Sequence, residues 1–286
     1  WSKSPLEELI NALNTPQLNT RMMISNLISD IYPKQAIEPV KQLMQSATTG
    51  NNSFVQGLWI LYRLNALPED MIAKALNHPD PIVQVHGLRV VAELKTLSAA
   101  QKLLTLNLLN NKDAQVKRFA AEALGHFPEY AQLQPLLDLY NATEARDTHL
   151  RYTLMVSIRN HLKQAFIMQQ VAAKKWSEED RSALFFVMTE IPTKEAAAFS
   201  FNYLKSHELQ GRQLENNLKY ISRYGTPAQA DELISLTQKR VGADTATEYK
   251  LFKSVNEGIA ERGGSQSARF KLWDARMDKL GLKPSQ

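Results

Sequence analysis

The stretch that decides the fold runs from Asn77 to Gly125 and contains one pattern written twice. The first copy reads NHPDPIVQVHGLRVVAEL over residues 77–94, and the second reads NNKDAQVKRFAAEAL over residues 110–124. Asp80 of the first copy aligns with Asp113 of the second, an offset of 33 residues. A period of this length is typical of a helix–turn–helix repeat. The sequence therefore predicts repeated helical hairpins here.

In each copy a short polar turn leads into a helix with one apolar face. Asp80 and Asp113 are placed to cap the helix that follows, because a carboxylate accepts hydrogen bonds from the free backbone amides. Pro81 suits the first helical position, where its missing N–H costs nothing. The residues at helical spacing that we expect to form the buried face are Val83, Gly87, Val90, Val91 and Leu94 in the first copy and Val116, Phe119, Ala120, Ala123 and Leu124 in the second. One hairpin cannot bury this face alone, so neighbouring hairpins must stack against it.

Helical periodicity continues along the whole chain, and alternating Val/Ile-rich runs are missing. We expect about fifteen helices arranged in pairs. The predicted fold is an all-α superhelix, or solenoid, of about seven hairpins plus a C-terminal helix over 268–280.

A weaker copy of the pattern over 14–28 predicts that Leu18 takes the place of Val83. Other expectations are a helix from Lys34 to Ala47, a break at 263–265 and a stop at Pro284. We expect a single repeat domain over residues 1–286, with a weak candidate boundary near 163.

The composition fits a soluble globular protein. Of 286 residues, 44% are hydrophobic and 22% are charged. No apolar run approaches the roughly 18 residues that a membrane helix needs. The chain has no cysteine, which excludes disulfides, a cysteine nucleophile, zinc–cysteine sites and covalent haem attachment within it. Because the first residue is Trp1 and not methionine, we expect the sequence to begin inside a larger or processed precursor.

The net charge of +5 is unevenly distributed. Residues 1–143 contain 12 Lys and Arg against 12 Asp and Glu, whereas residues 144–286 contain 22 against 17. Such an excess can steer an acidic partner towards the second half. A modest excess is more often an ordinary solvated surface, and both interpretations stay open.

The sequence offers no pattern for catalysis, a cofactor or a metal. Its six histidines form neither a His-x-x-x-His pair nor a His-Glu-x-x-His motif. Nucleotide-binding glycine loops and the Gly-x-Ser-x-Gly motif are also missing. The acidic pairs Glu7-Glu8 and Glu178-Glu179 fall in first helical turns, where carboxylates stabilise the helix end. We therefore predict no catalytic residues, no cofactor and no metal site.

The repeated Asp-Pro-x-Val-x-x-x-small pattern at 78–92 and 111–124 resembles HEAT-type repeats, and the hallmark residues of ankyrin and tetratricopeptide repeats are missing. Over 57–94 the chain is also similar to the helical-repeat segment of large extracytoplasmic bacterial proteins. Those proteins join a sugar-dehydrogenase-like propeller, HEAT repeats and a cytochrome c domain. In those proteins Arg-Arg-His or a similar triplet usually follows the valine. Here Gln84, Val85 and His86 follow Val83, so only the histidine matches. This resemblance implies an extracytoplasmic repeat module of a larger bacterial protein, and because the haem motif and propeller pattern are missing, it carries no oxidoreductase activity over to this chain.

The function that fits best is a scaffold for a protein partner or for neighbouring domains of the same polypeptide. In such solenoids the second helix of each hairpin lines a concave face. The exposed cations that we expect on that face are Arg63, Arg89, Lys117 and Arg118. The oligomeric state stays open.

The alternative is a nucleic-acid-binding protein, similar to the HEAT-like DNA glycosylases, in which Arg151 and Arg159 would extend the basic face. Glu93, Glu122 and Asp147 interrupt that ladder, and Trp59 and Tyr62 are interpreted as core residues instead of a base-flipping cluster. Nucleic acid is therefore the less favoured partner.

Overall fold

The computed structural model describes residues 1–46, 48–263 and 266–282. Over these ranges the chain forms 17 α-helices and no strand, and two short 3₁₀ turns follow α1 and α7. The all-α fold is therefore confirmed. The expected end of a helix at Ala47, part of the expected break at 263–265 and the expected stop at Pro284 lie outside the described residues.

The chain divides into two compact units, unit 1 over Trp1–Ser157 and unit 2 over Ile158–Gln286. The division falls inside α10 (Thr148–Leu162), a few residues before the candidate boundary near 163. That residues 1–286 act as one domain stays a prediction.

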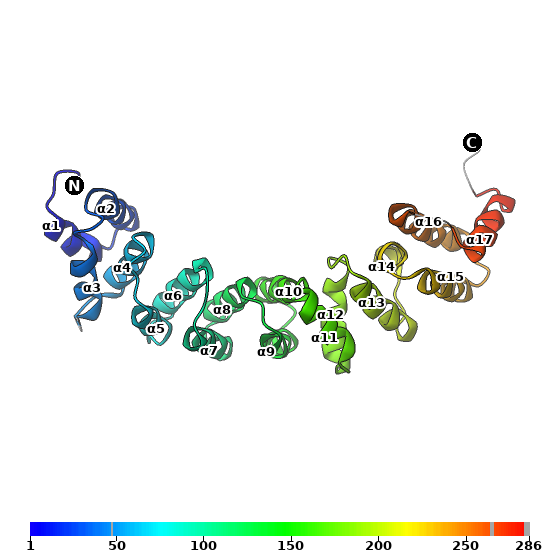
Figure 1. Cartoon of the computed structure of the whole chain (residues 1–286), viewed down its shortest axis with the longest axis horizontal. Helices are drawn as coiled ribbons and strands as arrows, with labels where there is room; N and C mark the ends of the chain where they lie inside the picture. The colour runs from blue at the N-terminus through cyan, green and yellow to red at the C-terminus, as the bar shows by residue number, and fades with distance from the viewer. Residues whose placement is uncertain (47, 264–265, 283–286) are drawn as a thin grey trace. The chain divides into compact units, whose positions relative to one another are not determined.

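Unit 1 is a row of stacked helical hairpins (Figure 1). The helices α2, α4, α6 and α8 pack one on the next and form one layer, while α5 and α7 are neighbours in the other layer. Within each pair, α3 packs on α4, α5 on α6 and α7 on α8. The helices of unit 1 are α1 (Leu6–Asn11), α2 (Leu18–Ile31), α3 (Ile37–Gln45), α4 (Asn51–Arg63), α5 (Glu69–Leu76), α6 (Pro81–Glu93), α7 (Ala99–Asn107), α8 (Ala114–His126), α9 (Tyr130–Ala142) and the larger part of α10.

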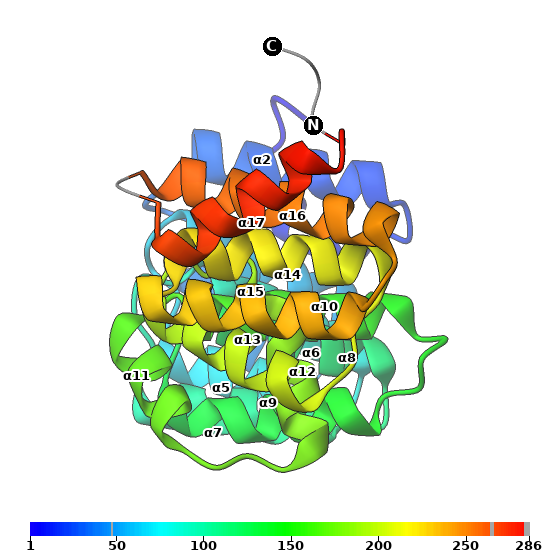
Figure 2. The same ribbon diagram turned by 90° about the vertical axis from the view of Figure 1, so that its right-hand side faces the viewer.

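Unit 2 continues the same hairpin design. Its helices are α11 (Ala165–Ala173), α12 (Glu178–Met188), α13 (Lys194–Ser206), α14 (Gly211–Tyr224), α15 (Pro227–Val241), α16 (Thr245–Arg262) and α17 (Ala268–Lys279). The helices α11, α13, α15 and α17 pack in sequence, and α14 packs on α16. In the view of Figure 2, α14 and α15 lie next to each other with their axes in similar directions.

The contact between α14 and α16 is unusually close because residue 258 is a glycine. A Cβ atom at Gly258 would come within 2.2 Å of the Lys219 carbonyl oxygen and 2.8 Å of the Ser222 Cβ. The two backbones can therefore approach each other only while residue 258 has no side chain.

The two copies of the repeat behave as predicted at their helix starts. The Asp80 carboxylate accepts a hydrogen bond from the Ile82 amide at 2.8 Å, and Pro81 is the first residue of α6. The Asp113 carboxylate accepts from Gln115 and Val116 at 2.8 and 3.1 Å. On the expected apolar face, Val83, Gly87, Val90, Val91, Val116, Ala120, Ala123 and Leu124 are buried.

The expected place of Leu18 is wrong. Leu18 is the first residue of α2 and is 56% exposed, whereas Val83 is the third residue of α6 and is fully buried. The two helices begin at different points of the pattern, so Leu18 points away from the core. Leu94 and Phe119 are also only partly buried, because Leu94 already lies past the end of α6.

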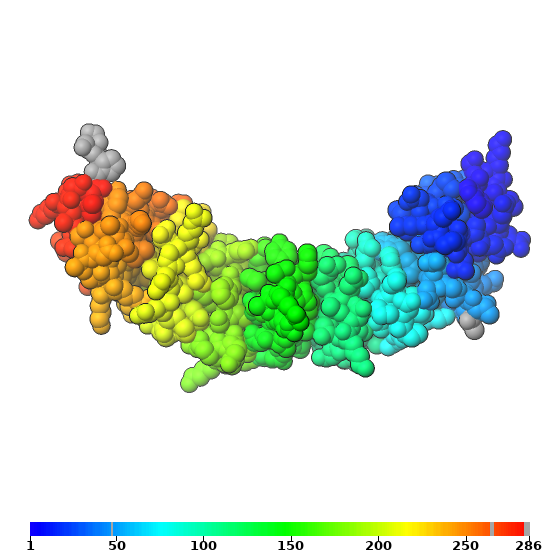
Figure 3. Space-filling view, turned by 180° about the vertical axis from the view of Figure 1, so that it is seen from behind, coloured from blue at the N-terminus to red at the C-terminus, as the bar shows by residue number. Residues whose placement is uncertain are grey.

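Side chains fill the spaces between neighbouring helices of each unit in the space-filling view (Figure 3). In unit 1 the cores of successive hairpins join into one apolar cluster that runs from Leu9 in α1 to Val90 in α6. Across the described residues, no helix combines the length and the apolar character that crossing a membrane requires.

Candidate functional site

The surface with the best geometry for binding is a groove on the even-numbered layer of unit 1, which we call the α2–α4–α6 groove. Its volume is about 690 Å³. Three neighbouring helices of this layer line the groove. The lining residues are Leu18, Met22, Ser25 and Asn26 of α2, Gln56, Trp59, Tyr62 and Arg63 of α4, and His86, Arg89 and Glu93 of α6.

The apolar part of the groove comes from side chains that the core does not use. Leu18 and Met22 are one helical turn apart on α2 and are 56% and 53% exposed. Trp59 and Tyr62 of α4 are half-buried, and their rings meet edge to face with centroids 6.0 Å apart. The interpretation of these two aromatic residues as core residues is therefore correct for only part of each ring. Exposed large apolar side chains beside rigid aromatic rings are typical of protein-binding surfaces.

A hydrogen bond between neighbouring helices fixes the orientation of Trp59. Its indole Nε1–H donates to Nδ1 of His86 at 3.0 Å. Since an indole N–H can only donate, Nδ1 must be unprotonated. Burial lowers the pKa of His86, and the nearby Arg89 cation lowers it further. His86 is thus held as a neutral imidazole that orients the aromatic ring.

The two cations of the groove, Arg63 and Arg89, are held in place by uncharged groups. Arg63 donates to Asn26 Oδ1 at 2.7 Å and to Ser25 Oγ at 3.2 Å. The Arg89 guanidinium lies over the Trp59 ring, 5.6 Å from its centroid, a favourable cation–π arrangement. Neither arginine forms an ion pair with the described residues. Their charges are therefore available to a ligand.

The structure brings together only two of the four cations predicted from the sequence. Lys117 borders a separate depression of about 300 Å³ formed with the α9–α10 connection. Arg118 lies over Phe119, 4.8 Å from the ring centroid. That these four residues contact a partner stays a prediction.

The arginines that would extend a basic ladder for nucleic acid make contacts within the protein. Arg151 donates to the backbone carbonyls of Tyr140 and Thr143 at 3.2 and 2.8 Å and so caps the end of α9. Arg159 forms an ion pair with Glu190 at 2.8 Å. Both side chains therefore already have a structural role.

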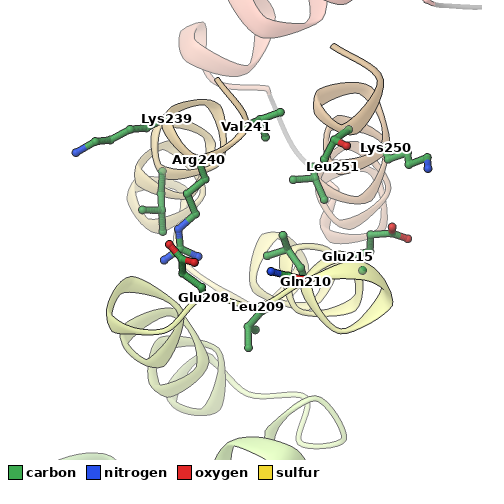
Figure 4. A pocket seen from close by; sticks show the side chains of 13 residues that line it. Glu208, Leu209, Gln210, Glu215, Lys239, Arg240, Val241, Lys250 and Leu251 are labelled. Carbon is green, nitrogen blue, oxygen red and sulfur yellow. The ribbon is translucent and has the colours of Figure 1, made fainter. Parts of the chain in front are cut away.

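Unit 2 contains a larger pocket of about 800 Å³ between the α13–α14 connection, α15 and α16 (Figure 4). Lys239 and Lys250 point outwards from it on opposite sides. Arg240 points towards Glu208 in the same view, and it donates to the Leu204 carbonyl at the end of α13 at 2.6 Å. Because its cations point away or hold the backbone, this pocket is a weaker candidate than the α2–α4–α6 groove.

Sequence reasoning missed the apolar part of the groove. Leu18 and Met22 carry a signal that could have found it, because they follow helical spacing on a different face from the buried Ile24 and Ile28. The juxtaposition of Trp59 and His86 joins positions 27 residues apart and leaves no local pattern in the sequence.

No three His, Asp or Glu side chains in the described ranges cluster closely enough to hold a metal ion.

Comparison with known proteins addresses the fold. No curated protein matches the chain significantly. Residues 69–152, which include both copies of the repeated pattern, α5 to α9 and the start of α10, match the family model described as HEAT repeats. The chain is therefore an all-α helical-repeat protein that is similar to HEAT repeats over this segment.

Proposed function

We propose that the chain is a non-catalytic scaffold that binds a protein partner or a neighbouring domain through the even-numbered layer of unit 1. The observation that carries the proposal is the α2–α4–α6 groove, where exposed apolar side chains, oriented aromatic rings and two arginines without ion pairs meet. HEAT repeats commonly serve in protein interaction, which supports the same function. Lys117 and Arg118 extend the proposed surface along α8.

The proposed setting is an extracytoplasmic repeat module of a larger bacterial protein. Its support is the sequence resemblance over residues 57–94, which includes the second half of α4 and the first repeat copy. Six of the eleven residues that line the groove lie within that segment.

Photo-crosslinking tests the scaffold function. A benzophenone amino acid at position 118, on the even-numbered layer, should form protein adducts in the cells that make the chain. The same group at Leu103, which is 59% exposed on α7 of the other layer, is the control and should form few. Mass spectrometry identifies the adducts, and equal labelling from both positions would contradict the proposed surface.

Double charge reversal, Arg89→Glu with Arg118→Glu, tests the residue assignment. Neither side chain forms an ion pair with the described residues, so the helical circular-dichroism signal and the melting temperature should stay close to those of the native chain. Affinity for the crosslinked partner should fall at least tenfold. An unchanged affinity would discard these residues as partner contacts.

Nucleic acid remains the competing partner and is tested by a mobility-shift assay with duplex DNA at two salt concentrations. Binding that is tight at low salt and steeply lost at higher salt would favour the nucleic-acid function. We expect no specific complex, because unit 1 has 14 basic residues against 14 acidic residues.

A further inference from the structure

We propose that the α2–α4–α6 groove binds an extended peptide segment in which an acidic residue lies beside a large apolar residue. This inference rests on the proposed scaffold function and names the chemistry of the partner. Three separate features of the groove support it, and each recognises a different part of such a peptide.

The first feature is a carboxamide at the groove surface that makes no hydrogen bond with the described residues. Gln56 of α4 lines the groove and is only 8% exposed. Its side chain makes no hydrogen bond with the described residues. The polar atoms of this amide therefore remain accessible from the groove, while the rest of the side chain is buried. One carboxamide can donate to a carbonyl and accept from an N–H, which are the two groups that an extended peptide main chain presents.

The second feature is the pair of uncompensated arginines, which recognises a carboxylate. Arg63 uses two of its donors on Asn26 and Ser25, and the remaining donors of its guanidinium are available. Arg89 lies over the Trp59 ring, 5.6 Å from its centroid. Glu93 is the one acidic residue lining the groove, so the charge there favours an acidic ligand. Guanidinium groups that are already oriented bind a carboxylate at little entropic cost.

The third feature is the apolar surface of Leu18, Met22 and Trp59, which accommodates a large apolar side chain. Leu18 and Met22 are both more than half exposed, and methionine adapts its shape to the side chain that covers it. Burying an apolar side chain against this surface would strengthen binding, because the apolar area of both partners leaves water.

The arrangement of the three features sets the length of the ligand. Packed helices lie about 8–10 Å apart, so a segment crossing from α2 to α6 spans roughly 20 Å. At about 3.3 Å per residue an extended chain needs about six residues for that distance. A nucleic acid strand fits the groove less well, because Glu93 and the aliphatic side chains of α2 occupy the positions where further phosphates would lie.

The test begins with a random twelve-residue peptide library displayed on phage and selected on the full chain. We expect enrichment of peptides in which Asp or Glu is adjacent to Leu, Met, Phe or Trp. A fluorescein-labelled synthetic peptide with the selected sequence is then titrated by fluorescence anisotropy. Arg63→Glu with Arg89→Glu should weaken its binding at least tenfold. The matched control is Lys95→Glu with Lys112→Glu, which makes the same charge change at exposed positions outside the groove and should weaken binding less than twofold.

Gln56→Leu separates main-chain recognition from folding. Leucine has nearly the same size and removes no hydrogen bond within the described residues, so the melting temperature should stay close to that of the native chain. Peptide binding should fall about tenfold or more. N-methylation of the peptide amide that faces residue 56 should weaken binding to the native chain and have much less effect on the Gln56→Leu variant, since a shared interaction is lost only once.

The outcomes distinguish the peptide assignment from the scaffold function. Selected peptides whose binding ignores all groove variants, or the absence of any enriched peptide, would overturn the peptide assignment, and the crosslinking experiment would still decide the scaffold function. If the groove variants instead abolish binding of a 20-base-pair duplex and affect no peptide, both proposals fail. Enrichment of basic peptides would also refute the proposed ligand chemistry.

Discussion

At the scale of single residues, one buried carboxylate connects the last two helices of unit 2. Glu248 of α16 is 3% exposed and accepts a hydrogen bond from Trp273 Nε1 at 2.9 Å. The same carboxylate forms an ion pair with Arg276 at 3.1 Å. Trp273 and Arg276 are one turn apart on α17, so a single carboxylate holds this helix against α16.

Replacement of Glu248 should therefore loosen α17. Glu248→Ala leaves the buried Trp273 N–H without an acceptor, which should lower the free energy of unfolding by about 2 kcal/mol. Glu248→Gln keeps an acceptor for the indole and should cost less. Urea unfolding measures both, and hydrogen exchange should be fastest in α17. Equal losses of unfolding free energy in Glu248→Ala and Glu248→Gln would mean that the negative charge of Glu248 matters more than its hydrogen bond to Trp273.

His86 should make the stability of unit 1 depend on pH. Burial and the Arg89 cation lower its pKa below the ordinary 6.5, so the unfolded chain binds the proton more readily than the folded chain. The contribution of the neutral imidazole is complete above about pH 6.5 and is lost progressively as the pH falls below that value.

The measurement is the urea midpoint at pH 7.5 and pH 5.5 for the native chain and for His86→Gln. Glutamine can accept from Trp59 and does not titrate, so the variant should lose less stability between the two pH values. Equal losses would show that His86 is not responsible for the pH dependence.

At the scale of elements, the closest helix pair depends on a single missing side chain. In Gly258→Ala the new Cβ would lie 2.2 Å from the Lys219 carbonyl oxygen. Alanine gains about 1 kcal/mol in helix propensity, but forcing apart two packed backbones costs about 1–3 kcal/mol or more. The net change in thermal unfolding should be destabilising.

Gly57→Ala in α4 is the matched comparison. The atoms nearest to its new Cβ belong to the Met44 side chain, at 2.7 and 2.8 Å, and that side chain can move more easily than a backbone. Gly57→Ala should therefore cost less than Gly258→Ala. A larger loss for Gly57→Ala would refute the steric explanation.

The sequence predicts elements best where the signals are local. The starts of α6 and α8 agree with the structure, because Asp80, Pro81 and Asp113 mark them within a few residues. Leu18 was misplaced because the turn before α2 lacks the capping aspartate that sets the register of α6 and α8. The groove was only half predicted. Exposed arginines can be recognised from helical spacing, whereas the meeting of Trp59 with His86 depends on how α4 packs against α6.

At the scale of the whole molecule, unit 1 contains an apolar core of its own. The apolar cluster that runs from Leu9 to Val90 lies wholly within unit 1. The charge is also divided, since unit 1 is balanced and the excess of +5 falls in unit 2. These features indicate that unit 1 can fold without unit 2.

A fragment of residues 1–163, which keeps α10 complete, should be helical by circular dichroism and unfold cooperatively in urea. The control fragment 1–157 ends inside α10 and lacks the buried Ile158 and Leu162, so it should be less stable. An unfolded 1–163 fragment would instead support a single domain over residues 1–286.

The matching caps at Asp80 and Asp113 also have a genetic consequence. Because both aspartates start their helices in the same way, an in-frame crossover between the two codons would join compatible turns. Each such event removes or duplicates 33 codons and leaves no broken helix at the junction. Unit 1 can therefore lengthen or shorten by whole hairpins during evolution, and we expect natural variants of this region to differ in steps of 33 residues.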